Sequence, residues 1–137
     1  MSLAKDRTST NLALLMLRVM VAAVFIYHGG QNFFVTGVGS FARDLDRLGI
    51  PLPTLSAYLA AGTEFVGGIL LLLGLFVRLA VVPLIFVMVV GILTVHRGAF
   101  SAEKGGMEYA LTLAVTLAVI GLLGPGKYAL KAPRRSD

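Results

Sequence analysis

Four long apolar segments constrain the fold of this chain more than any other feature of its sequence. They cover residues 12–34, 54–76, 79–96 and 107–123. A helix of about 20 apolar residues crosses the hydrocarbon core of a bilayer, which is about 30 Å thick. The segments are continuous and do not alternate with a period of two, which argues against membrane strands. Because backbone groups in lipid must bond to each other, the sequence predicts an all-α integral membrane four-helix bundle.

The composition supports one membrane domain over residues 1–137. The chain is 57% hydrophobic and only 14% charged, too few polar residues to cover a water-soluble domain of this size. Cysteine is absent, which excludes disulfides, thiolate metal sites and thiol–disulfide catalysis. The first apolar run has about 20 residues, longer than the 7–15 of a secretory signal, so we expect an uncleaved first span.

Lysine and arginine predict the orientation. The N-terminus, the short "FVR" hairpin between spans 2 and 3 and the C-terminal tail must share one side of the membrane. That side holds seven basic residues: Lys5, Arg7, Arg78, Lys127, Lys131, Arg134 and Arg135. The other side holds four: Arg43, Arg47, Arg97 and Lys104. The excess predicts that both termini lie in the cytoplasm. The net charge of +5 then indicates contact with anionic lipid and not nucleic-acid binding.

The connection between spans 1 and 2 contains "SFARDLDRLGIPLP". In it Phe41, Leu45 and Leu48 recur at helical spacing with charged residues between them. This pattern predicts a short amphipathic helix on the membrane interface, ended by Gly49 and Pro51.

Glu64 is the ionisable residue nearest the middle of a predicted span. It shares a helical face with the small residues Ala57, Ala61 and Gly68. Small residues let another helix approach closely, so this face and Glu64 should point into the bundle. A carboxyl group at such depth is costly and needs a purpose. Two alternatives stay open, a structural carboxyl group that holds two helices together and a role in binding a ligand or proton.

Three further residues are predicted to lie near Glu64, in the outer half of the bundle. His28 shares a face with Gln31 and Asn32 near the end of span 1, and His96 ends span 3. Glu108 begins span 4. The predicted topology brings His28, Glu64, His96 and Glu108 to one half of the bundle, which suggests a shared polar pocket. The alternatives are that the histidines cap the helix ends and that Glu108 stabilises a helix N-terminus.

Glu108 also starts a polar stripe with Thr112 and Thr116. Arg18 lies about 10 Å into span 1 from the cytoplasmic end. Its side chain could extend to the headgroups or reach toward Glu64. Two histidines and two glutamates suit zinc or iron, but the Glu-x-x-His spacing of di-iron bundles is absent. We therefore predict no metal site.

The sequence resembles the DoxX family of small bacterial membrane proteins along nearly its whole length. The shared motifs are "LRV" with Arg18, "YHGG" with His28, "EFVGGILLLLGLFVRLA" with Glu64, "TVH" with His96, "GGMEY" with Glu108, and "GPGKYAL". The resemblance implies a four-helix bundle in the bacterial plasma membrane with both termini inside. The family takes its name from a subunit associated with a terminal quinol oxidase. One departure is that Gln31 and Asn32 occupy a region where the family often has a lysine.

Three functions are compatible with these residues. The first is a redox-associated membrane subunit that binds a quinone or lipid-like ligand through His28, Gln31, Asn32, Glu64, His96, Glu108 or Arg18. The second is a structural or assembly subunit that contacts other membrane or redox proteins and has no chemistry of its own. The third is a transporter of protons or small solutes, working as a homo-oligomer. No pattern points to autonomous catalysis. The sequence itself requires no cofactor, and a quinone is the candidate that the resemblance suggests.

Overall fold

The computed structural model describes residues 2–130, with side chains from residue 6 onward. This part of the chain is all-helical, in the order α1 (Ser2–Gly30), a π-helical turn η1 (Gln31–Val35), α2 (Val38–Arg47), α3 (Pro53–Leu73), α4 (Val77–Thr94), a 3-10 turn η2 (Ala102–Lys104) and α5 (Glu108–Leu123). The side chain of Lys5, and Lys131, Arg134 and Arg135, lie outside the described part, so their predicted place at the cytoplasmic side stays a prediction.

The predicted spans correspond to α1 with η1, α3, α4 and α5. The first three are long and apolar enough to cross a membrane. The fourth, α5, is apolar but has 16 residues, fewer than the others. Within residues 2–130, three helices are therefore long and apolar enough to span a membrane, and the crossing by α5 stays a prediction. Helix α4 continues through Pro83 without a break.

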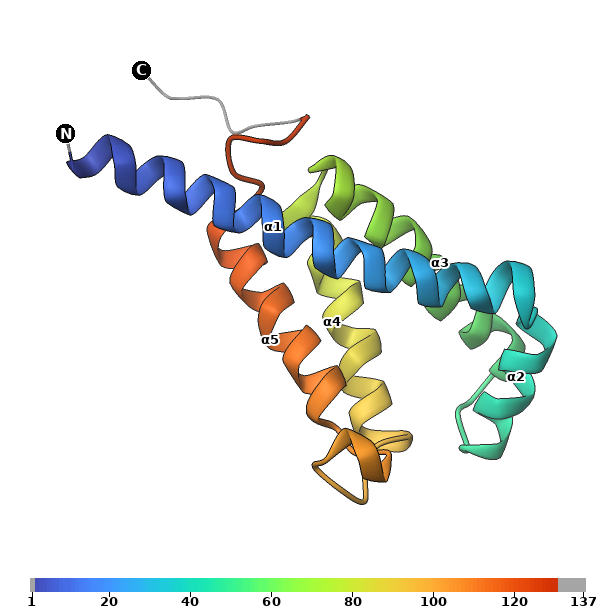
Figure 1. Ribbon diagram of the computed structural model, residues 1–137. Helices are drawn as coiled ribbons and strands as arrows, with labels where there is room; N and C mark the ends of the chain where they lie inside the picture. Colours follow the sequence, from blue (N-terminus) through green and yellow to red (C-terminus); the bar gives the residue numbers. More distant parts are fainter. Residues whose placement is uncertain (1, 131–137) are drawn as a thin grey trace.

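The helices form two arms that separate (Figure 1). Helix α1 packs along α3 to form the first arm, and α4 packs along α5 to form the second. The arms join near the end of α5 and the α3–α4 turn, on the side from which the start of α1 projects, which we call the terminal end. They diverge toward the opposite end, which carries α2 on one arm and the α4–α5 loop on the other. We call this the loop end.

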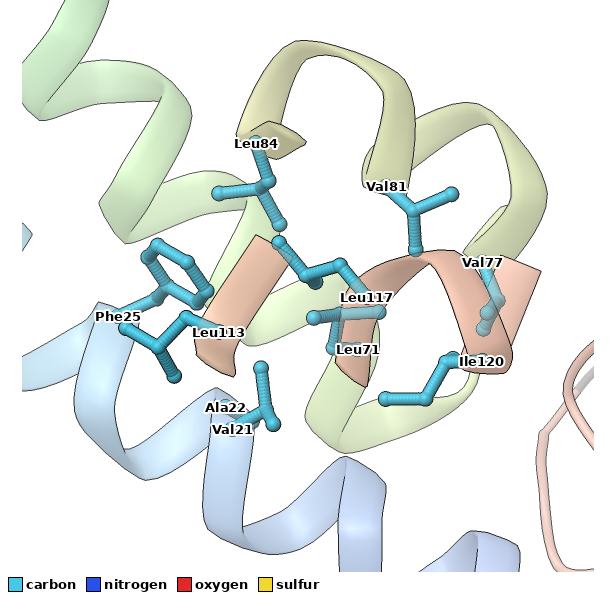
Figure 2. Packing of buried hydrophobic residues seen from close by; sticks show 10 residues of the cluster. All are labelled: Val21, Ala22, Phe25, Leu71, Val77, Val81, Leu84, Leu113, Leu117 and Ile120. Atoms are coloured by element: carbon cyan, nitrogen blue, oxygen red, sulfur yellow. The ribbon is translucent and has the colours of Figure 1, made fainter. Parts of the chain in front are cut away.

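The hydrophobic core lies where the arms join. Figure 2 shows ten buried side chains from four helices meeting there: Val21, Ala22, Phe25, Leu71, Val77, Val81, Leu84, Leu113, Leu117 and Ile120. The residues from α4 come from its first half and those from α5 from Leu113 onward, because the two helices run in opposite directions. The core therefore ends about halfway along each arm.

Glycines let the helices of the first arm approach closely. A Cβ atom on Gly29 would lie 2.5 Å from the main-chain nitrogen of Phe65, and one on Gly68 would lie 2.9 Å from that of Ile26. Both distances are far shorter than a normal contact between heavy atoms. Close packing between α1 and α3 thus depends on these two positions.

The short helix predicted between the first two spans is confirmed as α2. Its buried residues Ala42 and Leu45 pack against Ala57 of α3, together with the half-buried Phe41. The helix ends before Leu48, which is 41% exposed. The apolar face of α2 therefore covers the start of α3 within the protein.

Candidate functional site

One face of α1 passes from the core into the region where the arms have separated. Its buried part consists of residues spaced alternately by four and three: Leu14, Arg18, Val21 and Phe25, all at most 4% exposed. The same spacing continues to His28 and Asn32. His28 is exposed and Asn32 half-buried, because the second arm no longer covers them there. The helix thus presents an imidazole and an amide just beyond the core.

The corresponding face of α3 carries Glu64. Ala57 and Ala61 on this face are completely buried, and Gly68 is buried too, which confirms the prediction that the face points into the protein. Glu64 is the twelfth of 21 residues in α3 and only 8% exposed. Its Oε2 atom is buried and has no hydrogen-bond partner. A polar atom left unpaired in this way is costly, and in native proteins it calls for an explanation.

Gln31 does not act with His28. The Gln31 side chain donates a hydrogen bond to the Tyr27 hydroxyl group at 3.0 Å, and its main-chain oxygen accepts from Thr36. The His28 ring instead makes an edge-to-face contact with Tyr27, with ring centroids 5.4 Å apart. Of the two amides predicted beside His28, only Asn32 continues the face on which His28 lies.

The π-helical turn η1 brings an aromatic cluster that the sequence reasoning missed. Phe34 meets Phe65 edge to face at 5.5 Å between ring centroids, and Phe33 lies 6.2 Å from Tyr58. π-Helical turns occur often at functional sites. The sequence signal was the glycine pair Gly29 and Gly30, which comes shortly before Phe33 and Phe34. The glycines let α3 approach α1 closely, and the two large rings then pack against α3.

Arg18 lies inside the protein and binds main-chain oxygens. The side chain is 1% exposed. Its Nε donates to Leu71 at 3.0 Å, Nη2 to Leu72 at 3.4 Å, and Nη1 to Tyr128 at 3.0 Å and to Pro125. The expectation that Arg18 extends to the headgroups is therefore wrong, and so is a reach toward Glu64. A guanidinium has donors in several directions, so one side chain joins the end of α3 to the C-terminal segment.

His96 lies in the α4–α5 loop, and Glu108 is the first residue of α5. The Nδ1 atom of His96 lies 2.8 Å from the main-chain oxygen of Gly105, and Glu108 accepts a hydrogen bond of 2.7 Å from the nitrogen of Ala102. Because a carbonyl oxygen only accepts, Nδ1 of His96 carries the hydrogen. Both side chains thus bond to the main chain of the α4–α5 connection and hold it in shape.

The expected meeting of the four ionisable residues is wrong. The ends of α1 and of the α4–α5 loop lie on different arms at the loop end (Figure 1). Across the described residues, no group of three or more histidine, aspartate and glutamate side chains is placed to hold a metal ion. The sequence could predict a common depth in the membrane for the four residues, but not their positions in the membrane plane.

The threonine stripe of α5 also lies away from the core. The hydroxyl groups of Thr112 and Thr116 each donate to the main-chain oxygen four residues earlier, at 2.7 Å. Thr112 is exposed, whereas Leu113 and Leu117 face the core. Of the seven predicted site residues, His28, Asn32 and Glu64 thus remain free to meet a ligand between the arms, and each ligand-binding role stays a prediction.

Comparison with known protein families identifies the family of this chain. The sequence model of the DoxX family matches residues 13–97, which include most of α1 and all of α2, α3 and α4. The chain belongs to the DoxX family. That span contains Arg18, His28, Glu64 and His96, whose motifs carried the resemblance.

Two curated relatives extend the similarity beyond α4. An uncharacterized membrane protein of Mycobacterium tuberculosis is 38% identical over 128 residues, covering 83% of this chain and 76% of its own length. A Bacillus subtilis protein named "Putative oxidoreductase CatD" is 30% identical over 114 residues, covering 82% of each chain. No solved structure matches the chain.

Proposed function

We propose that this DoxX protein is a small subunit of the bacterial plasma membrane that works beside a redox enzyme and binds a quinone or similar lipid-soluble molecule between its arms. The Glu64 side chain carries this proposal. Its buried, unpaired Oε2 atom offers a hydrogen-bond acceptor at the middle of a membrane-spanning helix. Intramembrane ionisable residues are seldom retained without a functional partner.

His28 and Asn32 complete the proposed site. They continue the face of α1 beyond the core, as Glu64 does on the adjacent α3. A quinone has two carbonyl oxygens that accept hydrogen bonds, and its reduced form has two hydroxyl groups that donate them. His28 and Asn32 supply donors for the oxidised form, and Glu64 accepts from the reduced form. The similarity to CatD, a protein named as an oxidoreductase, supports a redox setting.

A binding assay on the purified full chain in nanodiscs tests this function. Short-chain benzoquinone and naphthoquinone analogues should bind in both redox states. Glu64→Met should weaken binding of the reduced form, and His28→Ala binding of the oxidised form, each by about tenfold, the effect of one lost buried hydrogen bond. Glu108→Met and His96→Ala are matched controls, because these residues hold the α4–α5 loop. Equal losses in all four variants, or no binding of either analogue to the unaltered chain, would overturn the proposal.

The proposed orientation puts both termini in the cytoplasm. The count over the whole sequence, seven basic residues on the side of the termini against four on the other, supports this orientation by the positive-inside rule. In that arrangement His28 and Glu64 are reached from the outer half of the membrane. Labelling of single cysteines at Asp6 and Ser101 in intact cells tests it: only Ser101→Cys should react with an impermeant maleimide.

An assembly subunit without ligand is the second candidate. The backbone bonds of Arg18, His96 and Glu108 favour it, since these three ionisable residues stabilise structure. Membrane subunits of this kind co-purify with stable protein partners. Extraction in mild detergent followed by mass spectrometry separates the candidates: a partner complex that Glu64→Gln leaves intact and active favours assembly.

A further inference from the structure

The neighbours of Glu64 on α3 show which way its side chain faces. Leu71 lies two helical turns later on the same face and points into the core that all four helices share (Figure 2). The glycines on either side of this face meet different helices. A Cβ atom on Gly67 would lie 3.0 Å from Leu84 of α4, and one on Gly68 would lie 2.9 Å from the main chain of α1. Glu64 therefore faces the space between α1 and α4, where the arms begin to separate.

Gly91 lies on the corresponding face of α4. It comes two helical turns after Leu84, which is completely buried in the core, and Met88 between them packs against the edge of that core. Because α3 and α4 run in opposite directions, Glu64 and Gly91 both lie on the loop-end side of Leu84. Gly67 packs against Leu84 and so marks a common level on the two helices. At a rise of about 1.5 Å per residue, Glu64 lies about 5 Å beyond that level and Gly91 about 10 Å.

The space in front of Gly91 is open within the chain. Of the glycines inside α3, α4 and α5, it is the one whose added Cβ atom would meet nothing within 4 Å. A Cβ atom on Gly121 of α5, in contrast, would lie 2.8 Å from Val81. Glycine is the least favourable residue apart from proline in a helix interior, by about 1 kcal/mol relative to alanine. Packing within the chain gives no reason for a glycine at position 91, whereas a ligand that needs the room does.

The two sides of this space differ in chemistry. The first arm supplies the buried, unpaired carboxyl oxygen of Glu64, together with His28 and Asn32. Residues 79–93 of α4 carry no polar side chain, so the second arm supplies an apolar surface. Ligand sites of this kind hold a molecule by a few polar groups and enclose the rest of it in apolar surface. A flat ring with oxygens on its edge fits both sides, because its edge is polar and its faces are apolar.

We propose that Gly91 limits the width of the ring that the site accepts, an inference that rests on the proposed function. The edge of the quinone ring lies toward Glu64, and one face of the ring lies over the main chain of α4 at Gly91. Glycine lets a ligand approach the backbone closely, and any side chain at this position would take the place of the ring. This side of the site makes no hydrogen bond through a side chain. It therefore acts by shape and treats the oxidised and reduced forms alike.

Gly91→Leu tests the inference in the quinone-binding assay on the full chain in nanodiscs. It should weaken binding of the naphthoquinone analogue by about tenfold in both redox states, because the added side chain fills the space that the ring needs. The narrower benzoquinone analogue should lose less, and Gly91→Ala should lose less than Gly91→Leu. Val89→Phe is the matched control, since it adds the same number of carbon atoms at a position that is 41% exposed and on the opposite face of α4. It should leave binding unchanged.

The redox states separate Gly91 from the hydrogen-bonding residues. Glu64→Met and His28→Ala should each weaken one form, whereas Gly91→Leu should weaken both. The ligand-free thermal midpoint of Gly91→Leu should not fall, since the position is open, and a fall would show a packed position and contradict the inference. If the unaltered chain binds an analogue and Gly91→Leu binds it as tightly, the inference is wrong and the proposed function stands. If the unaltered chain binds neither analogue, both are wrong.

Discussion

Arg18 and Leu71 are joined by a hydrogen bond between positions 53 residues apart, from the guanidinium Nε to the main-chain oxygen at 3.0 Å. The oxygen belongs to the last turn of α3, where its only main-chain donor among the described residues is the nitrogen of the cap residue Gly74 at 3.3 Å. In water such groups would also be hydrated, but inside a membrane protein they need a partner within the chain. One buried cation therefore joins the end of α3 to the C-terminal segment.

Replacing Arg18 with methionine should destabilise the protein. The variant keeps the apolar stem but removes the donor to the oxygens of Pro125 and Tyr128, and the shorter of the two bonds to the oxygen of Leu71. We expect a loss of about 2–4 kcal/mol, or about 10 °C in the thermal midpoint measured in mild detergent. Arg7→Met is the control, since Arg7 lies on the same helix and is exposed. Equal midpoints for the two variants would contradict the role of Arg18.

Two adjacent glycines of α1 should respond oppositely to alanine. A Cβ atom at Gly29 would lie 2.5 Å from the main chain of Phe65, whereas one at Gly30 would lie 3.7 Å from the Phe65 ring. Gly29→Ala should therefore force α1 and α3 apart and cost about 1–3 kcal/mol. Gly30→Ala should fit and add about 0.5–1 kcal/mol, because Gly30 already has helical dihedral angles. Thermal unfolding of both variants checks the pair, and a similar sign for both would contradict the close contact.

The sequence could predict the helices and the burial of Glu64 because both depend on local patterns. Continuous apolar runs predicted α1, α3, α4 and α5, although α1 begins at Ser2, ten residues before the predicted span, and other boundaries differ by up to three residues. The spacing of Ala57, Ala61 and Gly68 placed Glu64 on an inward face, where the structure has it. These inferences need only the period of a helix and the length of a membrane span.

The partners of Arg18 and His96 could not be predicted in this way. Arg18 binds main-chain oxygens of α3 and of the segment after α5, and no residue type marks those atoms. His96 likewise binds the main chain at Gly105. Sequence position also predicts the depth of a residue in the membrane but not its lateral place. For that reason His28 and His96 were expected together, although they lie on different arms.

Replacing the two predicted site glutamates with methionine should change the stability of the ligand-free protein in opposite directions. Glu64 has a buried Oε2 without a partner, so Glu64→Met should raise the stability of the ligand-free protein by about 1–3 kcal/mol. Glu108 accepts a hydrogen bond from Ala102, so Glu108→Met should lower it by about 1 kcal/mol. Thermal midpoints of ligand-free samples provide the measurement. A lower midpoint for Glu64→Met would mean that the carboxyl group is structural, and would favour the assembly function.

The α4–α5 loop should become accessible to trypsin when His96 is replaced. The loop contains Arg97 and Lys104, both exposed, and the bond from His96 to Gly105 holds its two ends together. His96→Ala removes a hydrogen bond worth about 1 kcal/mol, so local opening and cleavage should increase about fivefold. His28→Ala is the control, because His28 lies on the other arm and makes no bond to this loop. If both variants are cleaved at the rate of the unaltered protein, the loop is held by its backbone bonds alone, such as that from Met107 to Ala99.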